Sequence, residues 1–137
     1  MVKSNGQTYL RGQVWWSGNN SDAGANKSRP FVIVSNNAGN KFAPFVLAVP
    51  CTTEEKTNLA THVKLFFNNF NNTVLCEQIR TIYTSDLTGY ICTLDGEAMN
   101  QIDEALKVSL GLLNPNSNLI VDDLTNRRSE ERFSRNA

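Results

Sequence analysis

The sequence of 137 residues lacks several features that nucleases and membrane proteins commonly have. It contains a single histidine, so a ribonuclease mechanism based on a pair of histidines is excluded. No apolar run approaches the roughly 20 residues of a membrane span, and the first ten residues are polar, so we expect no membrane contact and no signal peptide. Glycine-rich phosphate loops and carboxylates at metal-ligand spacing are also missing. We therefore expect neither a metal nor a cofactor, and metal-dependent nuclease chemistry is disfavoured.

Cysteine is scarce as well. The three residues, Cys51, Cys76 and Cys92, are odd in number and lack metal-ligand spacing, so reduced thiols in a cytoplasmic protein are the simplest interpretation. A nucleophile pair of Cys51 and His62 is conceivable, but both residues flank strand patterns and no acid is in place to orient them. We expect His62 to be a structural residue instead.

The net charge of zero conceals an uneven distribution. Residues 1–80 carry eight Lys and Arg against four Asp and Glu, whereas residues 81–121 carry one Lys against five acids. A polyanion should therefore bind the first eighty residues, although unequal charge in a small domain can also serve solubility alone. The cations that could take part are Lys27, Arg29, Lys41, Lys56 and Arg80.

Two apolar runs of strand length lie on either side of a turn-forming segment. Residues 29–34 begin through Pro30, which is tolerated at the first residue of a strand, and residues 45–49 end at Pro50. Between them, residues 35–41 are rich in Ser, Asn and Gly, which favour turns. The pattern predicts a β-hairpin.

Antiparallel pairing of the two runs about a centre near Asn40 would place Arg29 directly opposite Thr52. Such residues project to one face of a sheet, with Cβ atoms about 4.5–5.5 Å apart. A guanidinium beside a hydroxyl could bind a phosphate group. A slip of one residue would instead bring Cys51 or Thr53 to this position.

A polar stretch, residues 17–28, leads directly to Arg29. Twelve residues without periodicity inside one domain are unusual, and such loops often bind ligands, so this segment is either a loop that covers a substrate or a plain mobile connection. It contains Asn26 and Lys27, which we include among the candidate substrate-binding residues.

Further strands are indicated by alternation of apolar and polar residues. In the longest candidate, residues 73–82, this alternation places Gln78 and Arg80 on one face, which is either the solvated side or a continuation of the phosphate site. The other expected elements are strands at 12–16 and 62–66 and turns at 54–58 and 68–72.

One helix is clearly indicated near the end of the chain. Asp95 is a good N-cap, Glu97 suits the first turn, and apolar residues then recur at helical spacing as far as Leu113. We expect this helix to pack on the sheet. Residues 1–113 would form a single domain, mainly β with a C-terminal α-helix, and residues 114–137 a flexible polar tail.

The available chemistry is that of Arg, Thr and Asn. Arginine is permanently charged and binds phosphate through two hydrogen bonds, so it can stabilise a phosphorane. RNA supplies its own nucleophile, the ribose 2′-hydroxyl, and an enzyme need only position it and stabilise the developing charge. Such a site requires no metal and no histidine, and DNA should be inert to it.

Four separated segments resemble successive motifs of the MazF/PemK toxin endoribonucleases, and LDGEAM at 94–99 through Leu113 is similar to the closing helix of that family. The four segments are RGQVW at 11–15, SRPFVIV at 28–34, VPCTT at 49–53 and EQIRTI at 77–82. The resemblance covers about residues 10–113, in the right order.

This resemblance implies a compact SH3-like barrel of the CcdB/MazF type that forms a homodimer. It implies metal-independent cleavage of single-stranded RNA at a short sequence by attack of the 2′-hydroxyl, leaving 2′,3′-cyclic phosphate and 5′-hydroxyl ends. It also implies neutralisation by a cognate antitoxin in the cytoplasm, with DNA contacted only through the antitoxin complex.

The resemblance assigns catalysis to Arg29 and Thr52. It places Gln78 at a substrate contact, with Arg80 and Thr53 as further candidates beside Asn26 and Lys27. The sequence departs from the family at two places. Residues 24–27 lack the acid of the common Gly-Ser-Glu-Gln motif, and Ser17 replaces an aspartate, so the cut-site preference cannot be transferred.

Two other classes of function stay open. The chain could be a non-catalytic module on the same barrel, either a gyrase poison like the CcdB toxins or an RNA binder, or it could be a purely structural domain. The presence of both Arg29 and Thr52 favours an enzyme. Incubation with long mixed-sequence RNA, and separately with gyrase, discriminates between these classes.

Overall fold

The computed structural model describes residues 7–18 and 28–114, which contain seven strands, two α-helices and one 3₁₀ turn, Thr84–Asp86. In the described part of the chain, neither helix has the length and apolarity that crossing a membrane requires. In chain order the strands and helices are β1 (Gln13–Ser17), β2 (Arg29–Ile33), α1 (Asn37–Phe42), β3 (Phe45–Thr52), β4 (His62–Phe67), β5 (Phe70–Leu75), β6 (Arg80–Tyr83), β7 (Leu87–Thr93) and α2 (Gly96–Ser109).

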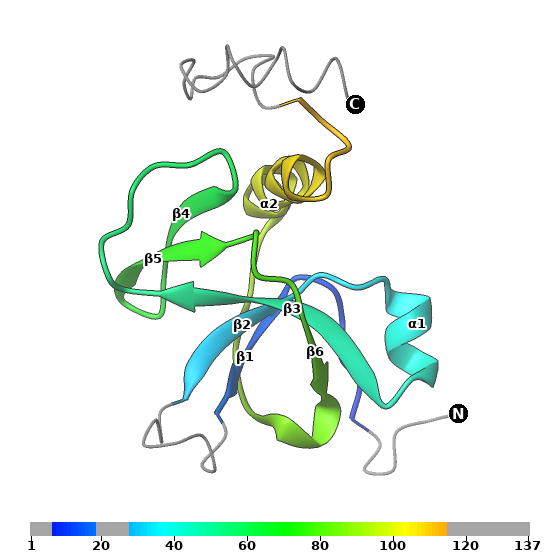
Figure 1. Cartoon of the computed structure of the whole chain (residues 1–137). Coiled ribbons are helices and arrows are strands. Elements are labelled where there is room, and N and C mark those ends of the chain that lie inside the picture. The colour runs from blue at the N-terminus through cyan, green and yellow to red at the C-terminus, as the bar shows by residue number, and fades with distance from the viewer. Residues whose placement is uncertain (1–6, 19–27, 115–137) are drawn as a thin grey trace.

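Strand β3 connects the two halves of the sheet (Figure 1). One of its edges pairs with β2, while the other pairs with β6 along residues 45–48 and with β5 at Cys51 and Thr52. Pro50 stands where β3 exchanges β6 for β5, a place where the missing N–H of proline interrupts no ladder on that edge. The predicted strand ended before Pro50. The observed one continues to Thr52.

All strand pairs are antiparallel, and the path through the sheet is β4-β5-β3-β2-β1-β7, with β6 also on β3. The sheet curves but does not close. No pairing within the described residues joins its outer strands β4 and β7, so the architecture is a half-barrel. Helix α2 lies beside β4 and closes one side (Figure 1). The predicted class, mainly β with a C-terminal helix, is confirmed.

The two faces of the central strands bury two separate hydrophobic clusters. The first cluster lies between the sheet and α2 and consists of Val14, Val32, Val49, Cys51, Val63, Phe67, Val74, Cys76, Ile102, Ala105 and Leu106. The second cluster lies on the opposite face and consists of Tyr9, Trp15, Phe31, Ile33, Val46, Ala48, Ile82 and Leu87. Alternation along β2 and β3 thus divides the buried apolar residues of the hairpin between the two clusters.

Several predicted boundaries were wrong. The single strand expected over residues 73–82 is two strands, because the chain turns after Leu75, where the Gln78 N–H donates to the Leu75 carbonyl at 3.1 Å. The turn expected at 68–72 is shorter. Asn68 and Asn69 alone form it, both with positive φ, which matches the twist of a two-residue hairpin. Helix α1 occupies the connection predicted as a turn, and β7 was not predicted.

Helix α2 begins as predicted and ends earlier. The Asp95 carboxylate accepts a hydrogen bond from the Ala98 N–H at 2.9 Å, which confirms the N-cap. The helix stops at Ser109 rather than near Leu113, because Gly111 adopts φ +77°. Two backbone hydrogen bonds of a Schellman motif follow. The Gly111 N–H donates to the Val108 carbonyl at 3.0 Å, and the Leu112 N–H donates to the Lys107 carbonyl at 2.7 Å.

Candidate active site

The hairpin formed by β2 and β3 has the predicted register. Its observed pairs are Phe31 with Pro50, Val32 with Val49 and Ile33 with Ala48. Continued by two residues, this register places Arg29 opposite Thr52, on the face of the sheet that carries the second cluster. Residues in such a relation have Cβ atoms about 4.5–5.5 Å apart. The printed pairs end at Phe31 and Pro50, and Thr52 itself pairs with Thr73 of β5. Arg29 and Thr52 thus lie at the same end of the hairpin and project to one face.

Arg29 is exposed at the start of β2, opposite Ser17 of β1. Within residues 7–18 and 28–114 its guanidinium forms no ion pair. The neighbouring hydroxyl of Ser17 is already used, because it donates to the carbonyl of Asp86 at 3.0 Å. Arg29 thus offers a full positive charge that is not neutralised by a described carboxylate.

Thr52 is half-buried at the end of β3. Its Oγ1 accepts a hydrogen bond from the Glu54 N–H at 3.1 Å, which holds the side chain in one orientation. A hydroxyl has one hydrogen to donate, and this bond leaves that hydrogen free. Thr52 can therefore donate to a phosphate oxygen.

The alternatives that a register slip would have produced are not at the site. Cys51 is fully buried in the first cluster, on the opposite face from Arg29. Burial raises the pKa of the Cys51 thiol far above its usual range, and the Arg29 charge counteracts this only weakly. A buried protonated thiol is a poor nucleophile. Thr53 is exposed one residue beyond β3 and has no partner strand.

His62 is structural, as predicted. Its side chain is only 6% exposed, with Nδ1 2.8 Å from the Thr57 carbonyl, to which it donates, and Nε2 3.1 Å from Oε2 of Glu77. Partial burial opposes ionisation of Glu77, but hydrogen bonds from Thr61 and His62 outweigh it and lower the pKa of the carboxyl. The imidazole is thus committed to holding two loops together and has no free nitrogen for a nucleophile pair with Cys51.

The structure brings a second arginine to the face that carries Arg29. The Arg80 Nη2 donates to Oε1 of Gln78 at 3.2 Å, and the guanidinium lies 5.6 Å from the centroid of the Phe31 ring. In the register of β3 with β6, Arg80 is opposite Ala48 of the second cluster. Reasoning from sequence paired Gln78 with Arg80, but it missed Phe31, although strand alternation already placed Phe31 beside Arg29.

Other predicted cations are not gathered here. Lys41 belongs to α1, near the opposite end of β3 from Thr52, and lies 5.4 Å from the Phe42 ring centroid. Lys56 is paired with Glu54 at 3.3 Å. Asn26 and Lys27 lie outside the described residues, as does the loop proposed to cover a substrate.

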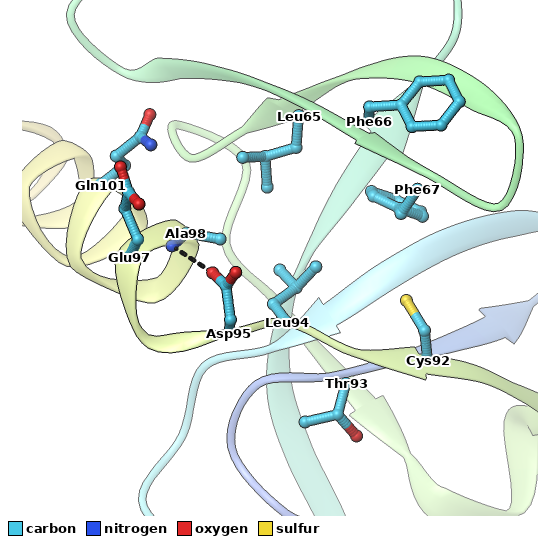
Figure 2. A pocket seen from close by; sticks show the side chains of 10 residues that line it. All are labelled: Leu65, Phe66, Phe67, Cys92, Thr93, Leu94, Asp95, Glu97, Ala98 and Gln101. Atoms are coloured by element: carbon cyan, nitrogen blue, oxygen red, sulfur yellow. Dashed lines mark hydrogen bonds between the residues drawn. The ribbon is translucent and has the colours of Figure 1, made fainter.

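A cavity of about 420 Å³ lies elsewhere, between β4, the end of β7 and the first turns of α2 (Figure 2). Of its polar groups, Asp95 is used as the helix cap and burial raises the pKa of Cys92. Nothing in it pairs a nucleophile with a base. Among the described residues, no three His, Cys, Asp or Glu side chains gather into a set that could hold a metal ion.

Residues 10–110 match a family model described as PemK-like, MazF-like toxin of type II toxin–antitoxin systems. The chain is 34% identical over 110 residues to Endoribonuclease EndoA of Bacillus subtilis (strain 168), an alignment that covers 75% of this chain and 95% of that protein.

Solved structures agree. A mycobacterial endoribonuclease is 32% identical, with a TM-score of 0.66 over 77% of this chain and 94% of its own. A mycobacterial endoribonuclease in complex with its cognate antitoxin is also 32% identical, with a TM-score of 0.68 over 79% of this chain and 100% of its own. MazE–MazF of Deinococcus radiodurans, 18% identical with a TM-score of 0.65 over 78% of this chain and 99% of its own, shares the fold. The chain belongs to the PemK-like, MazF-like family of type II toxins.

Proposed function

We propose that this protein is a toxin that cleaves single-stranded RNA, above all mRNA, at a short sequence and without a metal ion. The observation that carries the proposal is the placement of Arg29 opposite Thr52 on one face of the sheet, as the hairpin register implies. The names of the Bacillus and mycobacterial relatives as endoribonucleases support it.

The proposed reaction is an internal transfer within the RNA. The 2′ oxygen attacks the adjacent phosphorus, the bond from phosphorus to the 5′ oxygen breaks, and the proton lost by the 2′-hydroxyl ends on the leaving 5′ oxygen. Arg29 stabilises the charge that grows on the non-bridging oxygens, and Thr52 donates a hydrogen bond to one of them. The products carry a 2′,3′-cyclic phosphate and a 5′-hydroxyl, and DNA, which lacks the nucleophile, is not cut.

Binding of the strand extends the site beyond the two catalytic residues. Gln78 is proposed as a substrate contact, since the β5–β6 connection holds it within hydrogen-bond distance of Arg80. Thr53, Asn26 and Lys27 are retained as proposed substrate contacts. The catalytic domain is proposed to comprise residues 1–113, with residues 114–137 as an appendage.

The partners proposed are a cognate antitoxin and a second copy of this chain, with DNA contacted only through the antitoxin complex. A relative solved in complex with its antitoxin supports the first. Exposed apolar side chains on β3 and β6 support a protein interface, because Phe45 and Leu47 are 37% and 39% exposed and Tyr83 is 54% exposed. The toxin would act in the cytoplasm, where mRNA is translated.

The test is digestion of one long mixed-sequence RNA in the presence of EDTA, with the ends mapped by primer extension. We expect discrete cuts whose downstream fragments accept a 5′-phosphate from a kinase without prior dephosphorylation. Arg29→Ala should abolish the cuts and leave the unfolding free energy within about 0.5 kcal/mol, because Arg29 is exposed. An inactive wild-type protein, a strict need for metal, or full activity of Arg29→Ala would refute the proposal. Gyrase inhibition without RNA cleavage would identify a non-catalytic toxin instead.

A further inference from the structure

We infer that Arg80, held in place by Phe31 and Gln78, is a second phosphate site that binds the RNA backbone next to the bond that is cut. This inference rests on the proposed function and adds to it a defined role for a residue that contributes to binding rather than to the chemical step.

The first argument is position. Arg80 belongs to β6 but its side chain extends across β3, so that the guanidinium lies 5.6 Å from the centroid of the Phe31 ring on β2. Phe31 follows Arg29 by two residues on the same face, a separation of about 7 Å along a strand. Arg29 and Arg80 therefore project to the same face of the sheet, and Phe31 lies two residues from Arg29 and in contact with Arg80.

The second argument is that Arg80 is held but not neutralised. The ring of Phe31 is only 5% exposed and so forms a fixed base, and Gln78 accepts one hydrogen bond from Nη2. An arginine has five N–H donors, so most remain available to a ligand. None of the carboxylates in the described ranges is paired with Arg80.

The third argument is that the two contacts order the Arg80 side chain before any ligand binds. An arginine gives up about 2 kcal/mol of side-chain entropy when it is fully ordered. An exposed cation–π contact returns about 0.5–1 kcal/mol, and the hydrogen bond to Gln78 a similar amount, so the two contacts roughly offset this cost. A guanidinium ordered before binding, with its outer N–H groups open, suits bidentate contact with a phosphate, and the loss of entropy then no longer falls on the binding step.

The expected ligand is the sugar–phosphate backbone and not a base edge, because Arg80 flanks the phosphate site of Arg29 along the same surface. A backbone contact weakens with salt and is indifferent to sequence. Contact with a base edge would instead change the choice of cut site.

The test uses Arg80→Gln and Arg80→Lys, with Lys107→Gln as the matched loss of one exposed cation, since Lys107 lies on α2 beside Glu104. Cleavage of a long RNA is measured at several salt concentrations. Arg80→Gln should raise KM about tenfold, leave kcat unchanged and reduce the slope of log(kcat/KM) against log[salt] by about 0.7, the value for one phosphate of a single strand. Arg80→Lys should restore the slope but only part of the affinity, and Lys107→Gln should change neither.

A binding measurement keeps this inference separate from the proposed catalysis. The probe is a mixed-sequence RNA oligonucleotide that is 2′-O-methylated throughout and cannot be cut, followed by fluorescence anisotropy. Arg80→Gln should reduce the slope of log Kd against log[salt] by the same amount. Phe31→Leu, checked for folding by urea denaturation, should also weaken binding. Unchanged affinity and slope in Arg80→Gln would overturn the inference even if wild-type RNA cleavage is robust. A loss confined to kcat, or a changed cut-site sequence at constant slope, would overturn it as well.

Discussion

Replacement of Thr52 by valine separates its hydroxyl from its shape. Valine keeps the β-branched side chain in β3, but it can neither donate to a phosphate oxygen nor accept from the Glu54 N–H, which lies 3.1 Å from Oγ1. The two losses act on different quantities. The donated hydrogen bond contributes in the transition state, whereas the accepted one contributes to the folded state.

The magnitudes differ enough to be told apart. Removal of one preorganised donor to a developing oxyanion lowers kcat by about 10²–10³-fold, or about 2.7–4 kcal/mol. The bond from Glu54 is neutral and exposed, so water replaces it, and its loss should cost the folded state no more than about 1 kcal/mol. Thr52→Val should therefore be folded but strongly impaired.

The assay is single-turnover cleavage of a defined RNA, with stability measured by urea denaturation on the same preparations. Thr52→Ser is the matched control, because it restores the hydroxyl and loses only a methyl group, so its rate should stay within about tenfold of wild type, one 1.4 kcal/mol step. If Thr52→Val cleaves within threefold of an active wild-type protein, the hydroxyl takes no part in the transition state and the assignment of Thr52 fails.

Two further predictions concern stability. Because hydrogen bonds from Thr61 and His62 outweigh burial and lower the pKa of Glu77 from its usual 4.5, its contribution is present above that value and is lost as the pH falls through the lowered pKa. Between pH 7 and pH 3, the free energy of unfolding measured by urea denaturation should fall less in Glu77→Gln than in the wild type. An equal fall in both proteins would contradict the expectation. Gly111→Ala should destabilise by about 1–2 kcal/mol, because φ is +77° with no atom near the added methyl, and Gly96→Ala, equally open but at ordinary φ, should not.

The hairpin register could be predicted because it depends on local pattern alone. Apolar alternation on both sides of a turn-rich segment fixes which residues face which way, and a slip would expose a whole face of β2 or β3. The pairing of Arg29 with Thr52 follows directly, even though the connection contains helix α1 and not a simple turn. The start of α2 was equally accessible, since an N-cap is a property of a few neighbouring residues.

Most of the features that were missed depend on a distant partner. Pro50 ended the predicted strand because proline normally interrupts a ladder. In the structure Pro50 lies between the residues of β3 that pair with β6 and those that pair with β5, where no ladder is interrupted on that edge. The early end of α2 had a local signal in Gly111, which was passed over in favour of Pro115. Strand β7 is irregular, with register shifts against β1 that obscure its alternation.

The break between β5 and β6 has the largest consequence for function. If the register that pairs Thr52 with Thr73 continued without interruption, Arg80 would lie opposite Phe45, on the face away from Arg29. The observed pairing sets Arg80 opposite Ala48, three residues further along β3, a shift of about 10 Å. Because three is odd, the shift also moves Arg80 to the other face of the sheet, where it meets Phe31. The turn that divides the expected strand is therefore what places a second guanidinium beside the candidate site, and a single regular strand could not have done so.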